Sequence, residues 1–135
     1  MTSGATFTSS GFNEVLQLSF TGSSTRHFSL FGIGTNSATP TTTNTGLSGT
    51  IANWDGSAST FKAYVTGYPT FDALNNKATL RAFISASEAT GITIREYCDF
   101  NTNSPKAPAG RFVFADAITK TTSNQITIIS VYKRT

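Results

Sequence analysis

Residues 77–84 have the sequence KATLRAFI, and this stretch decides the fold. Along it, one set of apolar residues alternates strictly with the rest: Ala78, Leu80, Ala82 and Ile84. Side chains on a β-strand point to opposite faces in turn, so a period of two predicts a strand with one face against a core. The same period recurs along most of the chain.

Further segments with strand character follow at short intervals. Residues 27–33 place Phe28 and Leu30 on one face and Phe31 and Ile33 on the other, which predicts a strand covered on both sides. The remaining predicted strands lie near residues 61–65, 92–95, 111–114 and 125–133.

Two of these strands carry specific expectations about their faces. In residues 61–65, the side chains expected to face the core are Phe61, Ala63 and Val65. In residues 125–133, two apolar sets lie on opposite faces, Ile126 and Ile128 against Ile129 and Val131. We interpret this second pattern as a change of register within the strand.

Short strands separated by turn residues predict an all-β fold, a β-sandwich or jelly-roll-like barrel of about 7–8 strands. A length of 135 residues suits one domain, residues 1–135. Before the first strand, helical spacing relates Phe12, Val15, Leu16 and Phe20. We therefore expect a short helix or helical turn within residues 11–20, with a strand over residues 14–20 as the alternative.

Two long polar loops interrupt the strands. Residues 34–50 consist almost entirely of Gly, Thr, Ser, Asn and Pro, and residues 101–110 contain two prolines among small polar residues. Loops of such length without regular structure are uncommon in compact domains and tend to be functional. We expect them to act as arms that reach a neighbouring subunit.

The composition indicates a lightly charged, polar surface. Charged residues make up 13% of the chain, Ser and Thr together supply 40 residues, and the formal net charge is +3. The basic residues are scattered singly apart from the last pair, Lys133 and Arg134, so a nucleic-acid site is not expected. No segment is long and apolar enough for a membrane span, and the start has no leader pattern, which predicts a protein made and kept in a cytoplasm.

Residues suited to catalysis or metal binding do not form a recognisable set. His27 is the only histidine and alternates with apolar neighbours, which favours a structural or partly exposed residue over a catalyst. Cys98 is the only cysteine, which excludes an intrachain disulfide and favours a small buried side chain. Glu96 and Asp99 lie three apart on a strand and hence on opposite faces, a poor arrangement for paired acid chemistry. We predict no catalytic residues, no cofactor and no metal.

The single tryptophan, Trp54, allows two interpretations. Together with Tyr68 it could form a platform on which a sugar ring stacks. The alternative is that Trp54 anchors its loop onto the core, and we favour this role. An aromatic residue of this kind could equally anchor a subunit interface.

Five segments resemble a known family. They are the amphipathic residues 12–20 (FNEVLQLSF), residues 28–35 (FSLFGIGT), the Thr/Pro-rich residues 36–47 (NSATPTTTNTGL), residues 91–96 (GITIRE) and residues 118–121 (ITKT). Their order is similar to that of small bacteriophage virion proteins labelled as tail fibre or capsid decoration proteins. The chain departs from that family after Glu96, where residues 97–100 read YCDF in place of a Gly-Leu-Phe.

The resemblance implies a β-sandwich that serves as a building block without catalytic residues, often as a trimer. The function expected first is a capsid decoration (cement) protein that binds and stabilises the phage head. The alternatives are a tail, baseplate or tail-fibre component and a carbohydrate-binding module. Expected partners are copies of itself and the major capsid protein or tail proteins, without nucleic acid or membrane, in a virion assembled in the host bacterial cytoplasm. The residues expected at the interface are Trp54, Tyr68, Pro40, Thr42, Asn44, Lys106 and Pro108.

Overall fold

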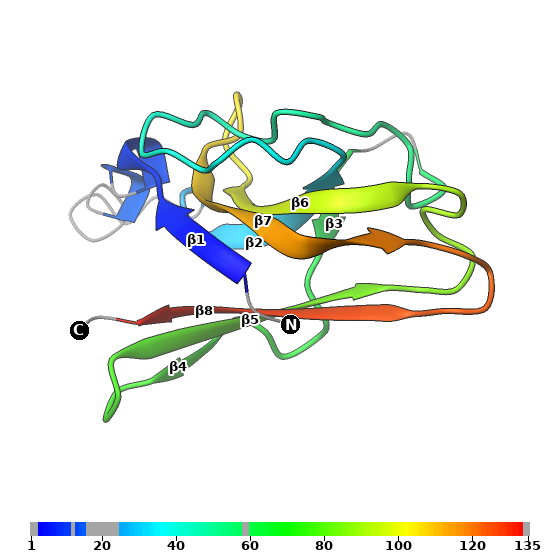
Figure 1. The fold of residues 1–135 in the computed structure, drawn as a ribbon. Helices are drawn as coiled ribbons and strands as arrows, with labels where there is room; N and C mark the ends of the chain where they lie inside the picture. Colours follow the sequence, from blue (N-terminus) through cyan, green and yellow to red (C-terminus); the bar gives the residue numbers. More distant parts are fainter. Residues whose placement is uncertain (1–2, 12, 16–24, 58–59, 134–135) are drawn as a thin grey trace.

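The chain folds into two antiparallel β-sheets that pack face to face, as a computed structural model shows (Figure 1). The structure describes residues 3–11, 13–15, 25–57 and 60–133. The predicted all-β, sandwich-like fold is confirmed, with eight strands among these residues.

The sheets are unequal in size. Sheet A has the strand order β1-β7-β6-β2-β3 and sheet B the order β4-β5-β8. The strands of sheet A are β1 (Ser3–Phe7), β2 (Phe28–Gly34), β3 (Lys62–Ala63), β6 (Thr93–Asn101) and β7 (Pro108–Thr119). Those of sheet B are β4 (Thr70–Asp72), β5 (Lys77–Ile84) and β8 (Ile126–Lys133).

The core lies between the sheets and is rich in aromatic rings. The alternation predicted for residues 77–84 is confirmed, because Leu80, Ala82 and Ile84 are buried while Arg81 is exposed. From sheet A, the ring of Phe31 lies 5.7 Å from that of Tyr97 and 5.5 Å from that of Trp54, measured between centroids. Such aromatic contacts add to the stabilisation from apolar burial.

Two predicted strand faces are wrong. In residues 61–65 the core residue is Tyr64, whereas Ala63 is exposed, because the Tyr64 hydroxyl reaches inward to donate to the buried carboxylate of Asp99. In β8 there is no change of register, since the β5–β8 pairing is continuous from Lys77–Lys133 to Ile84–Ile126. Strict alternation therefore places Ile129 and Val131 on the outer face, where they are 61% and 46% exposed.

Other differences concern short elements. The short strands β1 and β4 were not predicted. The predicted N-terminal helix is confirmed at residues 9–11 and 13–15, while Phe12, Leu16 and Phe20 lie outside the described residues. The predicted 101–110 loop is shorter than expected, because β6 runs to Asn101 and β7 begins at Pro108.

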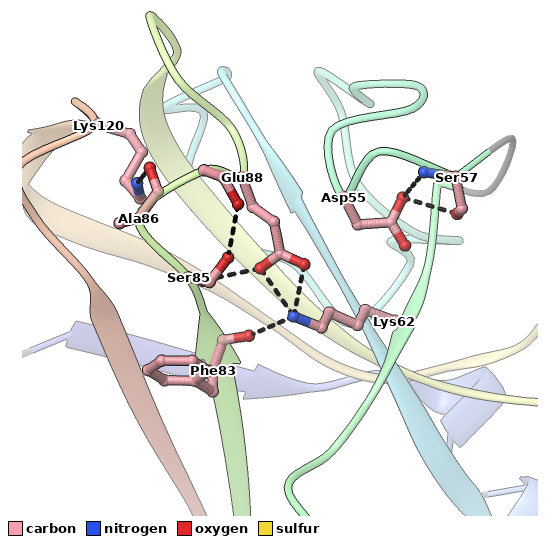
Figure 2. Close-up of polar contacts among 9 residues, drawn as sticks. Asp55, Ser57, Lys62, Phe83, Ser85, Ala86, Glu88 and Lys120 are labelled. Atoms are coloured by element: carbon pink, nitrogen blue, oxygen red, sulfur yellow. Dashed lines mark hydrogen bonds and ion pairs between the residues drawn. The ribbon is translucent and has the colours of Figure 1, made fainter.

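Lys62 joins the two sheets at one end of the sandwich (Figure 2). It comes from β3 in sheet A, and its Nζ lies 2.7 Å from Glu88 Oε1 and donates to the Phe83 carbonyl of β5 at 3.0 Å. Glu88 Oε2 also accepts the backbone N–H of Ser85. The buried Lys120 donates to the Ala86 carbonyl of the same turn. We call the contacts of Lys62 and Glu88 the clasp.

The clasp makes stability depend on pH. Burial raises the pKa of Glu88, but the hydrogen bonds from Lys62 and Ser85 outweigh it and hold the pKa below its ordinary value. A lowered folded pKa means that Glu88 contributes stability above its unfolded pKa and loses this contribution as the pH falls through the folded value.

Replacing Glu88 by Gln should therefore lower the free energy of unfolding by about 1 kcal/mol at neutral pH, a modest figure because the pair is partly solvated. The deficit relative to wild type should shrink as the pH falls below 4.5, the ordinary value for glutamate. Urea unfolding at several pH values measures both effects, with Asp116→Asn at an exposed position as the control. A deficit that stays constant with pH would contradict the clasp.

Candidate functional site

The long polar loop at residues 34–50 lies along the outer face of sheet A, where Figure 1 shows the chain running above β6 and β2. Its base is closed by a bridge between Gly34 and Thr50 and by the Thr35 N–H bonded to the Gly49 carbonyl at 3.0 Å. Farther along, the Thr42 carbonyl accepts the Ser9 N–H at 3.0 Å. The expected free arm is therefore a surface layer bound to its own chain.

Glu96 holds both ends of this loop. It is fully buried on β6, and its carboxylate accepts backbone N–H groups from Asn36 at 3.3 Å, from Ser48 at 3.0 Å and from Gly49. A Cβ on Gly34 would overlap the Glu96 side chain, so only glycine fits there. One acid thus fixes the loop at its start and at its end.

Arg111 on β7 completes the arrangement. Its Nε lies 2.6 Å from Glu96 Oε2, and both side chains are at most 1% exposed. Arg111 Nη1 donates to the Ala38 carbonyl, near the start of the loop, at 2.7 Å, while Nη2 is buried and has no hydrogen-bond partner among the described residues. Together, Glu96 and Arg111 bind the first part and the end of the loop, and we call this pair the loop anchor.

A second buried carboxylate, Asp99, lies on the opposite, inner face of β6. It is fully buried and accepts three tyrosine hydroxyls, from Tyr64 at 2.6 Å, from Tyr132 at 2.7 Å and from Tyr97. Since Tyr132 belongs to sheet B, this cluster ties the two sheets together through the core. The prediction that Glu96 and Asp99 lie on opposite faces is confirmed.

Burial controls the titration of the Asp99 cluster. Removal from water raises the pKa of Asp99 above its ordinary value, although the tyrosine hydroxyls oppose this shift. Burial, followed by the nearby Asp99 charge, also raises the pKa of the hydroxyls of Tyr64, Tyr97 and Tyr132. The tyrosines therefore stay protonated, as hydrogen-bond donors to the carboxyl group.

The remaining candidates for chemistry lie apart from one another. His27 is exposed and borders an apolar cleft of about 360 Å³ with Phe28 and Tyr132. Cys98 is buried, as predicted, and burial raises the pKa of its thiol. Within the described ranges, no three His, Cys, Asp or Glu side chains are grouped so as to hold a metal ion. Among the same residues, no helix is long and apolar enough to cross a membrane.

The structure places the predicted interface residues in different environments. Thr42 is exposed. The half-buried ones are Pro40, Asn44, Tyr68 and Lys106. Trp54 and Pro108 are buried in their own chain. Lys106 lies over the ring of Phe61, 5.2 Å from its centroid, in a hollow of about 410 Å³ that the two polar loops share.

Trp54 has the anchoring role that we favoured. It is 4% exposed, and its Nε1 donates to the Thr60 carbonyl at 3.0 Å. A ring buried in this way has no free face on which a sugar could stack. The sequence analysis did not identify Arg111 as an anchor, because an isolated arginine after a glycine has no local pattern that indicates burial.

Comparisons of the chain with protein-family models, with curated proteins and with solved structures found no match. Its function is therefore argued from its own residues.

The loop anchor predicts a local effect of Glu96→Gln. The amide of glutamine would place a donor against either Arg111 or the loop N–H groups, and breaking a buried ion pair costs about 3–5 kcal/mol. We expect hydrogen exchange at the amides of Asn36, Ser48 and Gly49 to accelerate by more than about tenfold. The amide of Val65, bonded to the Arg81 carbonyl, is the internal control. Unchanged exchange in the loop would contradict the anchor.

The Asp99 cluster predicts an unusual pH dependence. An aspartate with a raised folded pKa contributes stability below its unfolded value, 3.8, and loses it as the pH rises through the folded value. Asparagine keeps an oxygen for Tyr64 and Tyr97 but does not ionise. As the pH rises from acid to neutral, wild type should therefore lose stability relative to the Asp99→Asn variant.

Asp72→Asn is the matched control with the opposite sign. Hydrogen bonds from Asn75 lower the pKa of Asp72, so this variant should lose stability relative to wild type over the same range. Thermal unfolding followed by circular dichroism across that pH range measures both. Parallel slopes for the two variants would refute the assignment.

Proposed function

We propose that this chain is a non-catalytic structural subunit of a bacteriophage particle, expected first as a decoration protein on the head. The alternative position is in the tail, baseplate or tail fibre. The proposal rests on the resemblance of its segments to small virion proteins and on the roles that its charged residues have in the fold.

The observation that carries the proposal is the use of buried charge to fix a surface. Glu96 and Arg111 are buried ions, and their bonds go to a polar loop rather than to an open cavity. Fixing a loop in advance lowers the entropy lost when that loop packs against another protein. Such an arrangement suits a subunit whose contacts are repeated many times in an assembly.

Two further carboxylates, Glu14 and Glu88, support the same conclusion. Glu14 pairs with Arg26 at 2.9 Å and accepts bonds from the side chains of Asn101 and Asn103. Glu88 pairs with Lys62 across the sheets. These acids are engaged in holding segments together, as expected of a building block in which many small interfaces add up.

The proposal predicts that the chain is a component of purified particles. Quantitative mass spectrometry of gradient-purified phage should find it in many copies, and immunogold labelling should place it on the head. Particles that lack it should lose resistance to heating or osmotic shock, because a decoration protein adds contacts between capsid subunits.

Each result has a defined meaning. Gold confined to the tail would replace the head position by the tail alternative, and deletion would then leave head strength unchanged. Absence of the chain from purified particles would refute the proposal. Particles lacking a different, non-structural gene product are the control for head strength.

A further inference from the structure

The outer face of sheet B is bare, in contrast to that of sheet A. In Figure 1, sheet B forms the lower layer, and among the described residues no long loop runs along its lower side as the 34–50 loop runs along sheet A. The side chains on this face are Lys77, Thr79, Arg81 and Phe83 of β5 and Thr127, Ile129, Val131 and Lys133 of β8. We call these residues the basic face.

The centre of the basic face is apolar. Ile129 lies opposite Arg81, and Val131 lies opposite Thr79. Their exposures of 61% and 46% are high for β-branched residues on a regular strand. Apolar residues gathered on a surface and rimmed by polar ones are typical of protein interaction sites.

A comparison with β2 strengthens this argument. Strand β2 is apolar on both faces, and its second face is covered by the 34–50 loop, with Leu47 close to Gly32. Strand β8 is apolar on both faces too, since Ile126 faces the core and Ile129 faces outward. Among the described residues nothing covers its second face, where Ile129 and Val131 stay exposed, and this leaves an apolar surface on which another molecule can pack.

The rim of the face identifies the chemistry of that molecule. Lys77 and Lys133 lie directly opposite each other, and like charges in that position destabilise a sheet. Arg81 adds a third cation, exposed to solvent on the same side. The acid beside Lys77 is Asp72, which lies directly opposite it on β4 and offsets part of its charge, while also accepting bonds from Leu74 and Asn75 in its turn. Carboxylates from a partner would neutralise this rim.

A second copy of the chain does not supply them. Two basic faces packed together would oppose cation to cation. Of the seven acids of the chain, Glu14, Glu88, Glu96 and Asp99 are paired or buried, Asp55 bonds to Ser57, Asp72 lies beside Lys77, and Asp116 lies on β7 of the other sheet. Nucleic acid is also a poor fit. Proteins that bind it use aromatic stacking platforms and more cations than the three on this face.

We infer that the basic face docks on a different protein of the particle, through an apolar patch rimmed by Asp and Glu side chains. This inference rests on the proposed function and names the chemistry of the partner.

Carbodiimide cross-linking of purified particles tests the inference directly, because the reagent joins a lysine to a carboxylate in contact with it. Mass spectrometry should find Lys77 or Lys133 joined to an Asp or Glu of another virion protein. Acetylation of these two lysines should be at least about fivefold slower in intact particles than in the isolated chain.

Matched variants supply the second measurement. Arg81→Glu and Ile129→Ser should each lower incorporation into particles by about tenfold. The controls are Arg95→Glu, matched to Arg81→Glu, and Leu74→Ser, matched to Ile129→Ser. Both lie at exposed positions outside the face, and both variants should be incorporated into particles normally. Circular dichroism of each isolated variant establishes that it is folded before incorporation is compared.

The outcomes separate the two proposals. A chain present in particles with Lys77 and Lys133 freely acetylated, or cross-linked only to its own copies, overturns the inference and leaves the structural function standing. Protection that disappears after nuclease treatment would assign the face to nucleic acid and also overturn it. Absence of the chain from particles refutes the proposed function, and the inference with it.

Discussion

The buried ion pair of Glu96 and Arg111 is the constraint on which the outer surface of sheet A depends. Removing two ions from water is destabilising unless their geometry is close and their remaining hydrogen-bonding capacity is filled. Here the two atoms lie 2.6 Å apart, and backbone groups of the loop fill most of the rest. The loop has few apolar residues of its own, so hydrophobic burial would not fix it. The ion pair and the loop therefore stabilise each other.

Strand β6 connects this surface to the core, because its side chains alternate between the two. Glu96 points outward to the loop, while Tyr97 and Asp99 point inward to the aromatic core and the three tyrosine hydroxyls. A single strand thus positions two fully buried carboxylates, Glu96 and Asp99, one on each of its faces. The strict period of a β-strand makes this possible, since neighbouring residues serve opposite faces. A slip of one residue in β6 would exchange the two sets and break both networks.

Alternation predicted the two-sheet fold and the opposite placement of Glu96 and Asp99, because both follow from the period of two alone. It failed at Tyr64, where a hydroxyl reaching Asp99 on a distant strand decides which side faces inward. The loop anchor was not predictable either. Glu96 and Asn36 are separated by 60 residues, and no local pattern signals that a carboxylate on one strand will accept the N–H groups of a remote loop. Long-range polar contacts decide these features, and a single sequence does not display them.

The incorrect prediction for β8 is the most informative. Its two apolar faces are visible in the sequence, but their cause is not a change of register. Apolar residues on both faces of a strand indicate that both faces are covered, as is true of β2 under the loop. The sequence interpretation assigns Ile129 and Val131 of β8 to a change of register, which would direct their side chains toward the core. The continuous pairing with β5 excludes that explanation. Hydrophobic periodicity predicts which faces of a strand are apolar. It does not distinguish a face covered by the same chain from one covered by a neighbouring molecule. The exposure of Ile129 and Val131 on β8 is therefore the observation from which we propose a docking face.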